Sequence, residues 1–154
     1  VRAIVLWWRE CGRKMYPDTK ELLILVDSGG GNGWRTRGWK YHLQYELCDP
    51  YGLTVTICHY PPGASKWNPA DHRLHSEISK NWAGKPLDSY ETVLKYIRTT
   101  KTKTGLRVRA RLERKPYEKG ERIADWEMAE LCLTPHNTNP NWNYTLAPHP
   151  SSKM

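Results

Sequence analysis

Phenylalanine is absent from this chain, and so are long apolar runs. The longest apolar stretch near the start, Ala3 to Trp8, is far shorter than the ~20 residues of a membrane-spanning helix and too short for a signal-peptide core. The four cysteines form no CxxC pair, which argues against a zinc knuckle and a disulfide framework. We therefore expect a cytoplasmic protein with reduced thiols and no membrane association.

Positive charge is in excess. The chain has 24 Lys and Arg against 16 Asp and Glu, a net charge of +8. Such a surplus favours a polyanionic partner, most often nucleic acid; a basic surface that faces only solvent is the alternative. Eight Trp and nine Tyr supply enough apolar area for a small core. The length suits one compact domain, so we predict a single domain over residues 1–154.

The first half of the chain predicts a parallel crossover unit. Apolar residues between Val1 and Cys11 recur at helical spacing, and Gly12 and Pro17 close that helix. The run Leu22–Val26 predicts a strand buried on both faces. Residues 34–48 predict a helix with Trp39, Leu43 and Leu47 on one side, followed by a turn at 49–52. Leu53–Cys58 predicts a second strand. Strand, helix and strand with short connections form a right-handed parallel unit.

The second half predicts more helix and one further strand. A helix begins at Asn68 or Pro69, and Ser89 caps the next one. Between Leu106 and Leu112 apolar residues alternate with arginines, which predicts a half-buried strand with an arginine face. Asp125 is expected to cap a short helix that reaches Leu131. After Pro135 we expect irregular structure, because the tail is rich in Asn, Pro and His.

Two aspartates stand where α/β sheets build their sites. Asp27 follows the first strand, and Asp71 lies in the first turn of the helix after the second strand. Asp27 has an alternative role as a turn residue, and Asp71 as a charge that favours the helix dipole. Carboxylates from neighbouring strand ends can also bracket a divalent cation, as phosphoryl transfer on DNA requires.

Two other chemistries are weaker. The glycine loop 29–33 suggests a nucleotide-binding module, but GGGNG lacks the spacing of a dinucleotide fingerprint and GxxxxGK[ST] is absent. A zinc site is the other alternative, with ligands from Cys58, His59, His72 and His75.

The longest motifs carry a family resemblance. The segments in question are LLILVDSGGGNGWRTRGWK, TVTICHYPPGASKWNPADHRLHS, NWAGKPLDSYE, TTKTKTGLRVRARL and NWNYTLAP. In this order they resemble the DDE transposase domain of Rhodopirellula-type (ISAzo group) insertion sequences, over nearly the whole chain.

The resemblance implies an α/β fold of the ribonuclease H type and a bacterial enzyme. We expect a partial fold of this kind, with a short, mainly parallel sheet flanked by helices and a β-hairpin near the C-terminus. Three acidic residues would hold two Mg²⁺ or Mn²⁺ ions. Asp27 resembles the second acid, and Asp71 falls at the third, where the family has Glu. The first acid is expected upstream of Val1, so the isolated chain should be a poor nuclease.

DNA is the partner that the resemblance implies, with a nucleoid-associated location. The parent would cleave transposon ends and join the 3′ hydroxyl to target DNA; the alternative is an inactive DNA-binding remnant. Without its expected partner strand, Leu22–Val26 should self-associate or be covered by the N-terminal helix or the C-terminal tail, where Trp142 and Tyr144 supply apolar surface. The basic residues proposed to follow the DNA backbone are Arg35, Arg37, Lys40, Lys66, Arg73, Lys101, Lys103, Arg107, Arg109 and Arg111.

Overall fold

The computed structural model describes residues 1–117 and 120–150, apart from the side chains of Ser65 and Asp71. The chain divides into two compact units. The sheet unit comprises Val1–Pro62 and Gly120–Met154, and the helical unit comprises Gly63–Lys119. The single domain over residues 1–154 stays a prediction.

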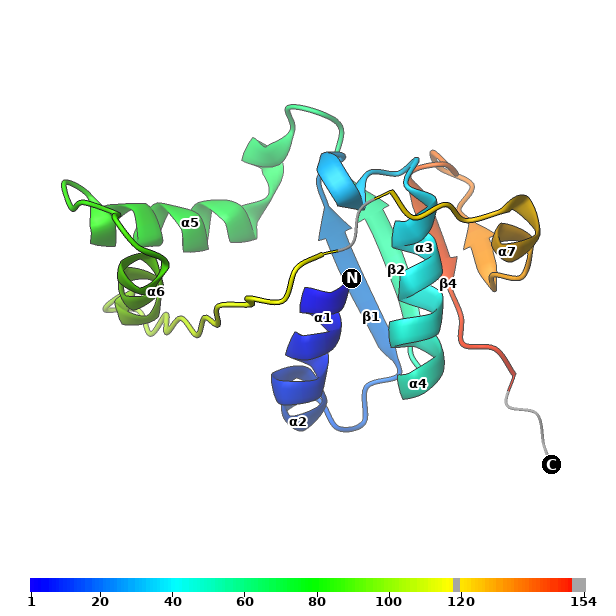
Figure 1. Ribbon diagram of the computed structural model, residues 1–154, viewed down its shortest axis with the longest axis horizontal. Coiled ribbons are helices and arrows are strands. Elements are labelled where there is room, and N and C mark those ends of the chain that lie inside the picture. Colours follow the sequence, from blue (N-terminus) through cyan, green and yellow to red (C-terminus); the bar gives the residue numbers. More distant parts are fainter. Residues whose placement is uncertain (118–119, 151–154) are drawn as a thin grey trace. The chain divides into compact units, whose positions relative to one another are not determined.

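The sheet unit contains a four-stranded mixed sheet in the order β1-β2-β4-β3 (Figure 1). Its strands are β1 (Glu21–Val26), β2 (Thr54–His59), β3 (Leu133–Pro135) and β4 (Asn143–Leu146). The β1–β2 pair is parallel, as predicted, with Ile24 opposite Ile57. The β2–β4 and β3–β4 pairs are antiparallel. The α/β class is confirmed, but this sheet is not mainly parallel.

Helices cover one face of the sheet. Val55 and Ile57 of β2 and Tyr144 and Leu146 of β4 point to this face and are almost fully buried. They form one apolar core with residues from α1 (Arg2–Trp7), α3 (Arg37–Leu43) and the turns that follow these helices (Figure 1). The core therefore lies between the helices and this face of the sheet.

Strand β1 is buried on one face only, which corrects the prediction of burial on both. Leu22, Ile24 and Val26 pack against the core, whereas Leu23 is 60% exposed and Leu25 45%. A continuous apolar run does not reveal how many faces are covered, because that depends on the layers that pack on it. Among the described residues β1 pairs only with β2, so it forms one edge of the sheet.

As far as Pro150, the C-terminal tail does not cover that edge. Its strand β4 pairs with β2 instead, where Tyr144 lies opposite Ile57. The expected cover of Leu22–Val26 by the tail is therefore wrong. The expected irregular structure after Pro135 is also wrong at Asn143–Leu146, because these residues gain a partner strand on each side.

The first helix extends past Gly12, the first of its two predicted terminators, and ends at Met15, before Pro17 as predicted. Helix α1 continues through a π-helical turn, Trp8–Gly12, into α2 (Arg13–Met15). A Cβ atom on Gly12 would lie 2.5 Å from the Trp8 ring, and Trp8 is only 3% exposed. Gly12 therefore allows close packing inside the helix and does not terminate it.

The second helix follows the predicted pattern. Helix α3 continues through a π-helical turn, Gln44–Cys48, into α4 (Asp49–Tyr51). Trp39, Leu43 and Leu47 are all buried, as their spacing predicts. The predicted turn at residues 49–52 is instead a last helical turn, which ends at Gly52 with a left-handed φ of 61°.

The helical unit contains α5 (Pro69–Trp82) and α6 (Tyr90–Thr99). Asn68 caps α5 by accepting a hydrogen bond from the Ala70 amide. Ser89 caps α6 by accepting one from the Thr92 amide, as predicted. Asn81 joins the two helices by donating to the Tyr96 carbonyl at 2.7 Å.

The predicted strand Leu106–Leu112 does not form. Among the described residues this segment makes one isolated bridge, between Arg107 and Lys101. It is still extended enough for burial to alternate, with the arginines exposed and the apolar residues between them half-buried. Alternation reports a chain with one side covered, whereas a strand also needs a neighbouring strand.

The last helix, α7 (Asp125–Ala129), begins at Asp125, with Ala124 at the cap position. The Glu127 carboxylate accepts a hydrogen bond from the Ala124 amide, so Glu127 performs the capping that was expected of Asp125. In the described ranges, no helix combines the length and the apolar character needed to cross a lipid bilayer.

Candidate functional site

Asp27 directly follows β1, at the carboxyl ends of the two parallel strands β1 and β2. The Tyr60 amide donates to the Val26 carbonyl at 2.7 Å. On the other side of Asp27, the Ser28 hydroxyl donates to the Tyr60 carbonyl at 2.8 Å. These bonds join the chain before and after Asp27 to the end of β2. The backbone that carries this carboxylate is therefore anchored.

The Asp27 carboxylate is exposed, and one of its oxygens is held by the glycine loop. Oδ1 accepts a hydrogen bond from the Asn32 side-chain amide at 3.2 Å and a longer one from the Gly29 amide at 3.5 Å. Because both donors approach Oδ1, Oδ2 stays available for a ligand. The loop thus orients the carboxylate without enclosing it.

Gly30 makes this loop possible. It opens a short 3₁₀ turn, Gly30–Asn32, with a left-handed φ of 58°, which costs any residue with a Cβ atom about 1–2 kcal/mol. The turn returns Asn32 to the Asp27 carboxylate. Helix α3 begins only at Arg37, so the loop does not lead directly into a helix N-terminus as a phosphate loop does.

An aromatic pair lies beside the glycine loop. The rings of Trp34 and Trp142 are 6.3 Å apart, and the Arg35 guanidinium lies 4.5 Å above the Trp34 ring. The Trp142 carbonyl accepts a hydrogen bond from the His59 amide at 3.2 Å. The end of β2, the loop and the start of β4 therefore meet near Asp27.

A buried polar cluster lies among α3, β2 and β4. The Trp39 indole nitrogen, both His59 ring nitrogens and the Tyr144 hydroxyl are buried, and among the described residues none of them has a partner in good hydrogen-bond geometry. The nearest polar groups are Trp39 for the Tyr144 hydroxyl and the Asp27 backbone for the His59 ring. Burial, aided by the Lys40 cation, lowers the pKa of His59, although Asp27 acts in the opposite direction. Sequence reasoning considered His59 only as a zinc ligand and did not identify the cluster.

The donor chemistry at Asp27 fits a hard divalent cation, since an exposed carboxylate oxygen is the ligand that Mg²⁺ and Mn²⁺ prefer. Among the side chains that the structure describes, no group of three His, Cys, Asp or Glu residues could hold a metal. The zinc site therefore gains no support, and His72 Nε2 donates to the Lys66 carbonyl at 2.8 Å. The Asp71 side chain lies outside the described residues, so its meeting with Asp27 stays a prediction.

The basic residues near the loop have partners within the sheet unit. Arg37 donates to the Ile123 carbonyl at 3.0 Å and forms an ion pair with Asp125 at 2.6 Å. Lys40 is half-buried with its Nζ 5.1 Å from the centre of the Tyr144 ring, and burial lowers its pKa. Of the predicted DNA-binding set only Lys40 is not exposed; the exposed members are Arg35, Arg37, Lys66, Arg73, Lys101, Lys103, Arg107, Arg109 and Arg111.

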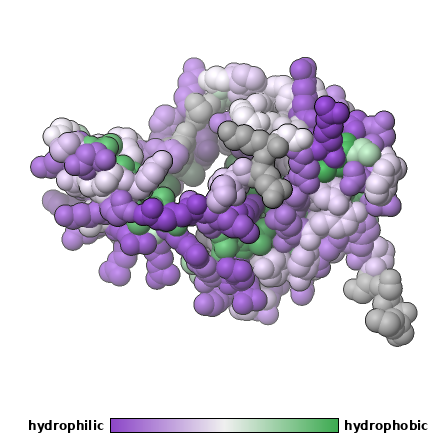
Figure 2. Space-filling model, in the orientation of Figure 1, coloured by the Kyte–Doolittle hydropathy of each residue, from purple (hydrophilic) through white to green (hydrophobic). Residues whose placement is uncertain are grey.

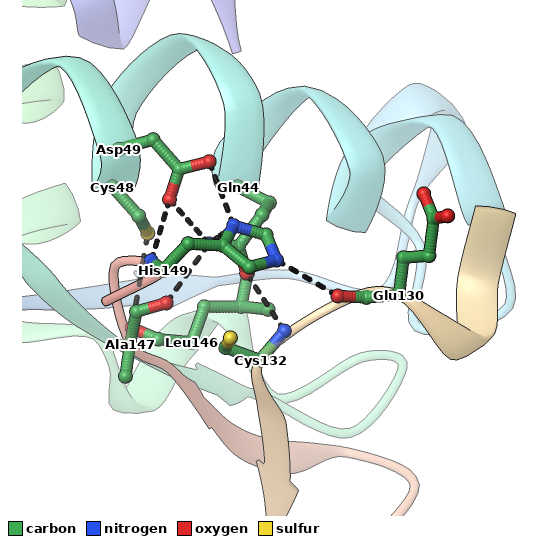
Figure 3. Close-up of polar contacts among 8 residues, drawn as sticks. All are labelled: Gln44, Cys48, Asp49, Glu130, Cys132, Leu146, Ala147 and His149. Atoms are coloured by element: carbon green, nitrogen blue, oxygen red, sulfur yellow. Dashed lines mark hydrogen bonds and ion pairs between the residues drawn. The ribbon is translucent and has the colours of Figure 1, made fainter. Parts of the chain in front are cut away.

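A second polar cluster joins the end of the helix to the C-terminal tail (Figure 3). Gln44 is fully buried. Its amide nitrogen donates to Asp49 Oδ1 at 2.7 Å and to the Ala147 carbonyl at 2.8 Å. Its amide oxygen accepts from the Cys132 amide at 3.1 Å. One side chain therefore links three segments that are distant in sequence, a role that its position on a predicted helix does not reveal.

A known protein family matches nearly the whole chain. The family described as the Rhodopirellula transposase DDE domain matches residues 1–148. No significant match was found among curated proteins or among solved structures. The match includes Asp27, the glycine loop, Asp71 and all strands of the sheet. The chain therefore belongs to the family of Rhodopirellula transposase DDE domains.

Proposed function

We propose that this domain supplies two of the three acidic residues with which a transposase cleaves the ends of its DNA element and joins them to target DNA. The observation that carries the proposal is the state of the Asp27 carboxylate. It is exposed, its backbone is anchored to β2, and one oxygen is held by Asn32. This is how a metal ligand is prepared before the ion arrives.

Asp71 is proposed as the second ligand from this chain. It lies in the first turn of α5, two residues after Pro69, within the motif Trp67-Asn68-Pro69-Ala70-Asp71-His72. Mg²⁺ or Mn²⁺ bound by these acids would activate the attacking oxygen and stabilise the leaving one. The chain's own contribution is to orient the carboxylates and to leave one oxygen of Asp27 open.

The test replaces Asp27 by Asn in the transposase that contains this domain together with the first acidic residue of the family. Asn keeps an oxygen that can accept from Asn32 and Gly29, so folding should be unchanged. Removing a group that only orients a metal ligand lowers metal affinity or activity about 10–100-fold. Removing a ligand itself should lower them further. We expect cleavage and joining to fall at least ~100-fold, and Mn²⁺ binding, measured by electron paramagnetic resonance, to weaken.

Asp18→Asn is the matched control. Asp18 is also exposed and lies before β1, at the opposite end of the strand. The Asp18→Asn substitution should leave both the cleavage and joining activity and the Mn²⁺ binding unchanged. Equal loss in the two variants, or Mn²⁺ binding that ignores Asp27, would overturn the role of Asp27. If the protein is instead an inactive DNA-binding remnant, the native protein should bind DNA, and neither it nor the two variants should cleave DNA.

A further inference from the structure

The excess positive charge of the chain lies in one unit. The helical unit, Gly63–Lys119, contains 14 Lys and Arg residues against 6 Asp and Glu, a net charge of +8. The sheet unit has 10 of each sign and is neutral. Asp27 therefore belongs to the neutral unit, and attraction for a polyanion resides in the other one.

Within the helical unit, one extended segment presents arginines at regular spacing. Residues 106–112 follow a tight loop that is closed by Gly105, whose amide donates to the Thr102 carbonyl. Arg107, Arg109 and Arg111 are exposed along the segment, and Leu106, Val108, Ala110 and Leu112 between them are half-buried. Side chains two residues apart in an extended chain are separated by about 6.6 Å.

The segment lies along α6 and is fixed to it at two places. Arg98 donates through Nε to the Ala110 carbonyl at 2.8 Å, and Arg114 forms an ion pair with Glu91. Because Arg98 lies near the end of α6 and Glu91 near its start, the segment runs antiparallel to the helix. Its apolar side chains turn inward, so the arginines form an outward ridge. Hydrophilic side chains cover most of the molecular face in Figure 2.

We propose that this arginine ridge, residues 106–112, is the main contact of the chain with the phosphate backbone of double-stranded DNA. The proposal rests on the function proposed above and identifies the surface through which the chain would bind DNA. Each DNA strand carries one phosphate per 3.4 Å of helix axis, and because the strand winds around that axis its successive phosphates lie farther apart than this rise. A ridge with one arginine per ~6.6 Å can therefore follow a strand and meet successive phosphates. Contacts of this kind position the protein without reading sequence.

The experiment measures binding of the full chain to a duplex of unrelated sequence over a series of salt concentrations. Each phosphate contact contributes about −0.9 to the slope of log affinity against log salt. In the triple variant Arg107→Gln, Arg109→Gln, Arg111→Gln this slope should be less steep, by the contribution of two to three phosphate contacts. The corresponding triple Lys variant keeps the charges and should retain most of the slope.

A matched control removes the same charge from the sheet unit. Arg9, Arg13 and Arg122 are exposed, and replacing all three by Gln should change the slope by less than one contact. Circular dichroism melts of both triple variants show that each is folded. Equal weakening by the two triple variants, or an unchanged slope in the ridge variant, overturns the ridge and leaves the proposed function in place. Salt-independent binding by the native chain overturns both.

Discussion

His149 and Asp49 are bonded at two points (Figure 3). The His149 backbone amide donates to Asp49 Oδ1 at 2.9 Å, and ring Nδ1 lies 2.9 Å from Asp49 Oδ2. Ring Nε2 lies 2.9 Å from the Glu130 carbonyl. Asp49 Oδ2 and the Glu130 carbonyl accept hydrogen bonds, so both of these bonds form only when the imidazole is protonated. The Gln44 amide nitrogen, which only donates, lies farther from Nδ1, at 3.3 Å. The ring also stacks on Tyr45.

This geometry predicts a stability that depends on pH. The hydrogen bond to Asp49, followed by the one to Glu130, raises the pKa of His149. A raised folded-state pKa contributes stability that is complete below the ordinary histidine value of about 6.5 and is lost as the pH rises through the folded value. The difference in melting temperature between native protein and His149→Gln should therefore be largest below about pH 6.5 and shrink as the pH rises through the raised pKa of His149.

At the acidic end Asp49 sets the limit. Burial alone would raise the pKa of Asp49, but the hydrogen bonds from His149 and Gln44 outweigh it and lower the pKa. Its contribution is present above about pH 4 and lost as the pH falls through the lowered value. His72→Gln is the control for His149→Gln. A neutral His72 can donate to the Lys66 carbonyl, so replacing it should have an effect on stability that does not depend on pH. A pH-independent effect of His149→Gln would contradict the charged pair.

Gln44→Leu should destabilise the protein by roughly 3 kcal/mol, because the volume is kept while the Ala147 carbonyl and the Cys132 amide lose their buried partner. Chemical denaturation measures the loss. Gln44→Glu separates charge from hydrogen bonding: it keeps an acceptor for Cys132 but adds a carboxylate beside Asp49. The Gln44→Glu variant should be least stable at neutral pH and should regain part of its stability in acid, where the carboxylates are protonated. A variant that is more stable at neutral pH than in acid would count against the assigned bonds.

Gly30→Ala should destabilise the glycine loop by about 1 kcal/mol, since φ at Gly30 is 58°. Space is not the reason, because nothing lies within 4 Å of a Cβ atom built there. Gly31→Ala is a close control: its Cβ would be equally free, and its φ is not left-handed. Amide hydrogen exchange of the loop reports the difference. Equal effects at the two glycines would show that the left-handed φ is unimportant.

Asp71→Glu should raise activity in the transposase that carries this domain. The family resemblance implies Glu at this position, and its side chain, one methylene longer, should reach a shared cation more easily. We expect Mn²⁺ affinity and DNA joining to rise by a factor on the order of ten. Asp88→Glu adds the same methylene at an exposed loop residue and should do nothing. A fall in joining would mean that the site is built around the shorter side chain.

Leu23→Thr with Leu25→Thr should reduce self-association. Both leucines are exposed on β1, and β1 lies at the edge of the sheet, where unpaired backbone groups form a template for another chain. Sedimentation velocity over a range of protein concentrations tests this. Leu87→Thr removes an exposed leucine of the helical unit and serves as control. A native protein that stays monomeric throughout would disprove association through β1.

Sequence patterns predicted the elements that depend on local signals. The helix with Trp39, Leu43 and Leu47 formed because its apolar spacing matches a helix with one buried side. Caps at Asn68 and Ser89 formed because a side chain and a nearby amide decide them. Asp27 was placed correctly at the end of a strand for the same reason. The ligand pair with Asp71 stays a prediction.

Features that depend on distant partners were missed. Whether Leu23 and Leu25 are covered is decided by neighbouring layers and not by their own run of apolar residues. Strand β4 has a weak local signal, yet it forms because Tyr144 and Leu146 complete the buried face beside β2. His149 gave no signal at all, since a histidine in an irregular tail acquires its role only when folding brings it to Asp49.

The place of β4 in the sheet has a consequence for synthesis. Thr56 of β2 and Thr145 of β4 share a hydrogen bond across 89 residues of chain. At a translation rate of about 5–20 residues per second, β2 waits roughly 4–18 seconds before its second neighbour exists. During that time its apolar side chains and unpaired edge are open to other chains. Production of this protein should therefore depend on chaperones that shield a nascent strand until translation delivers β4.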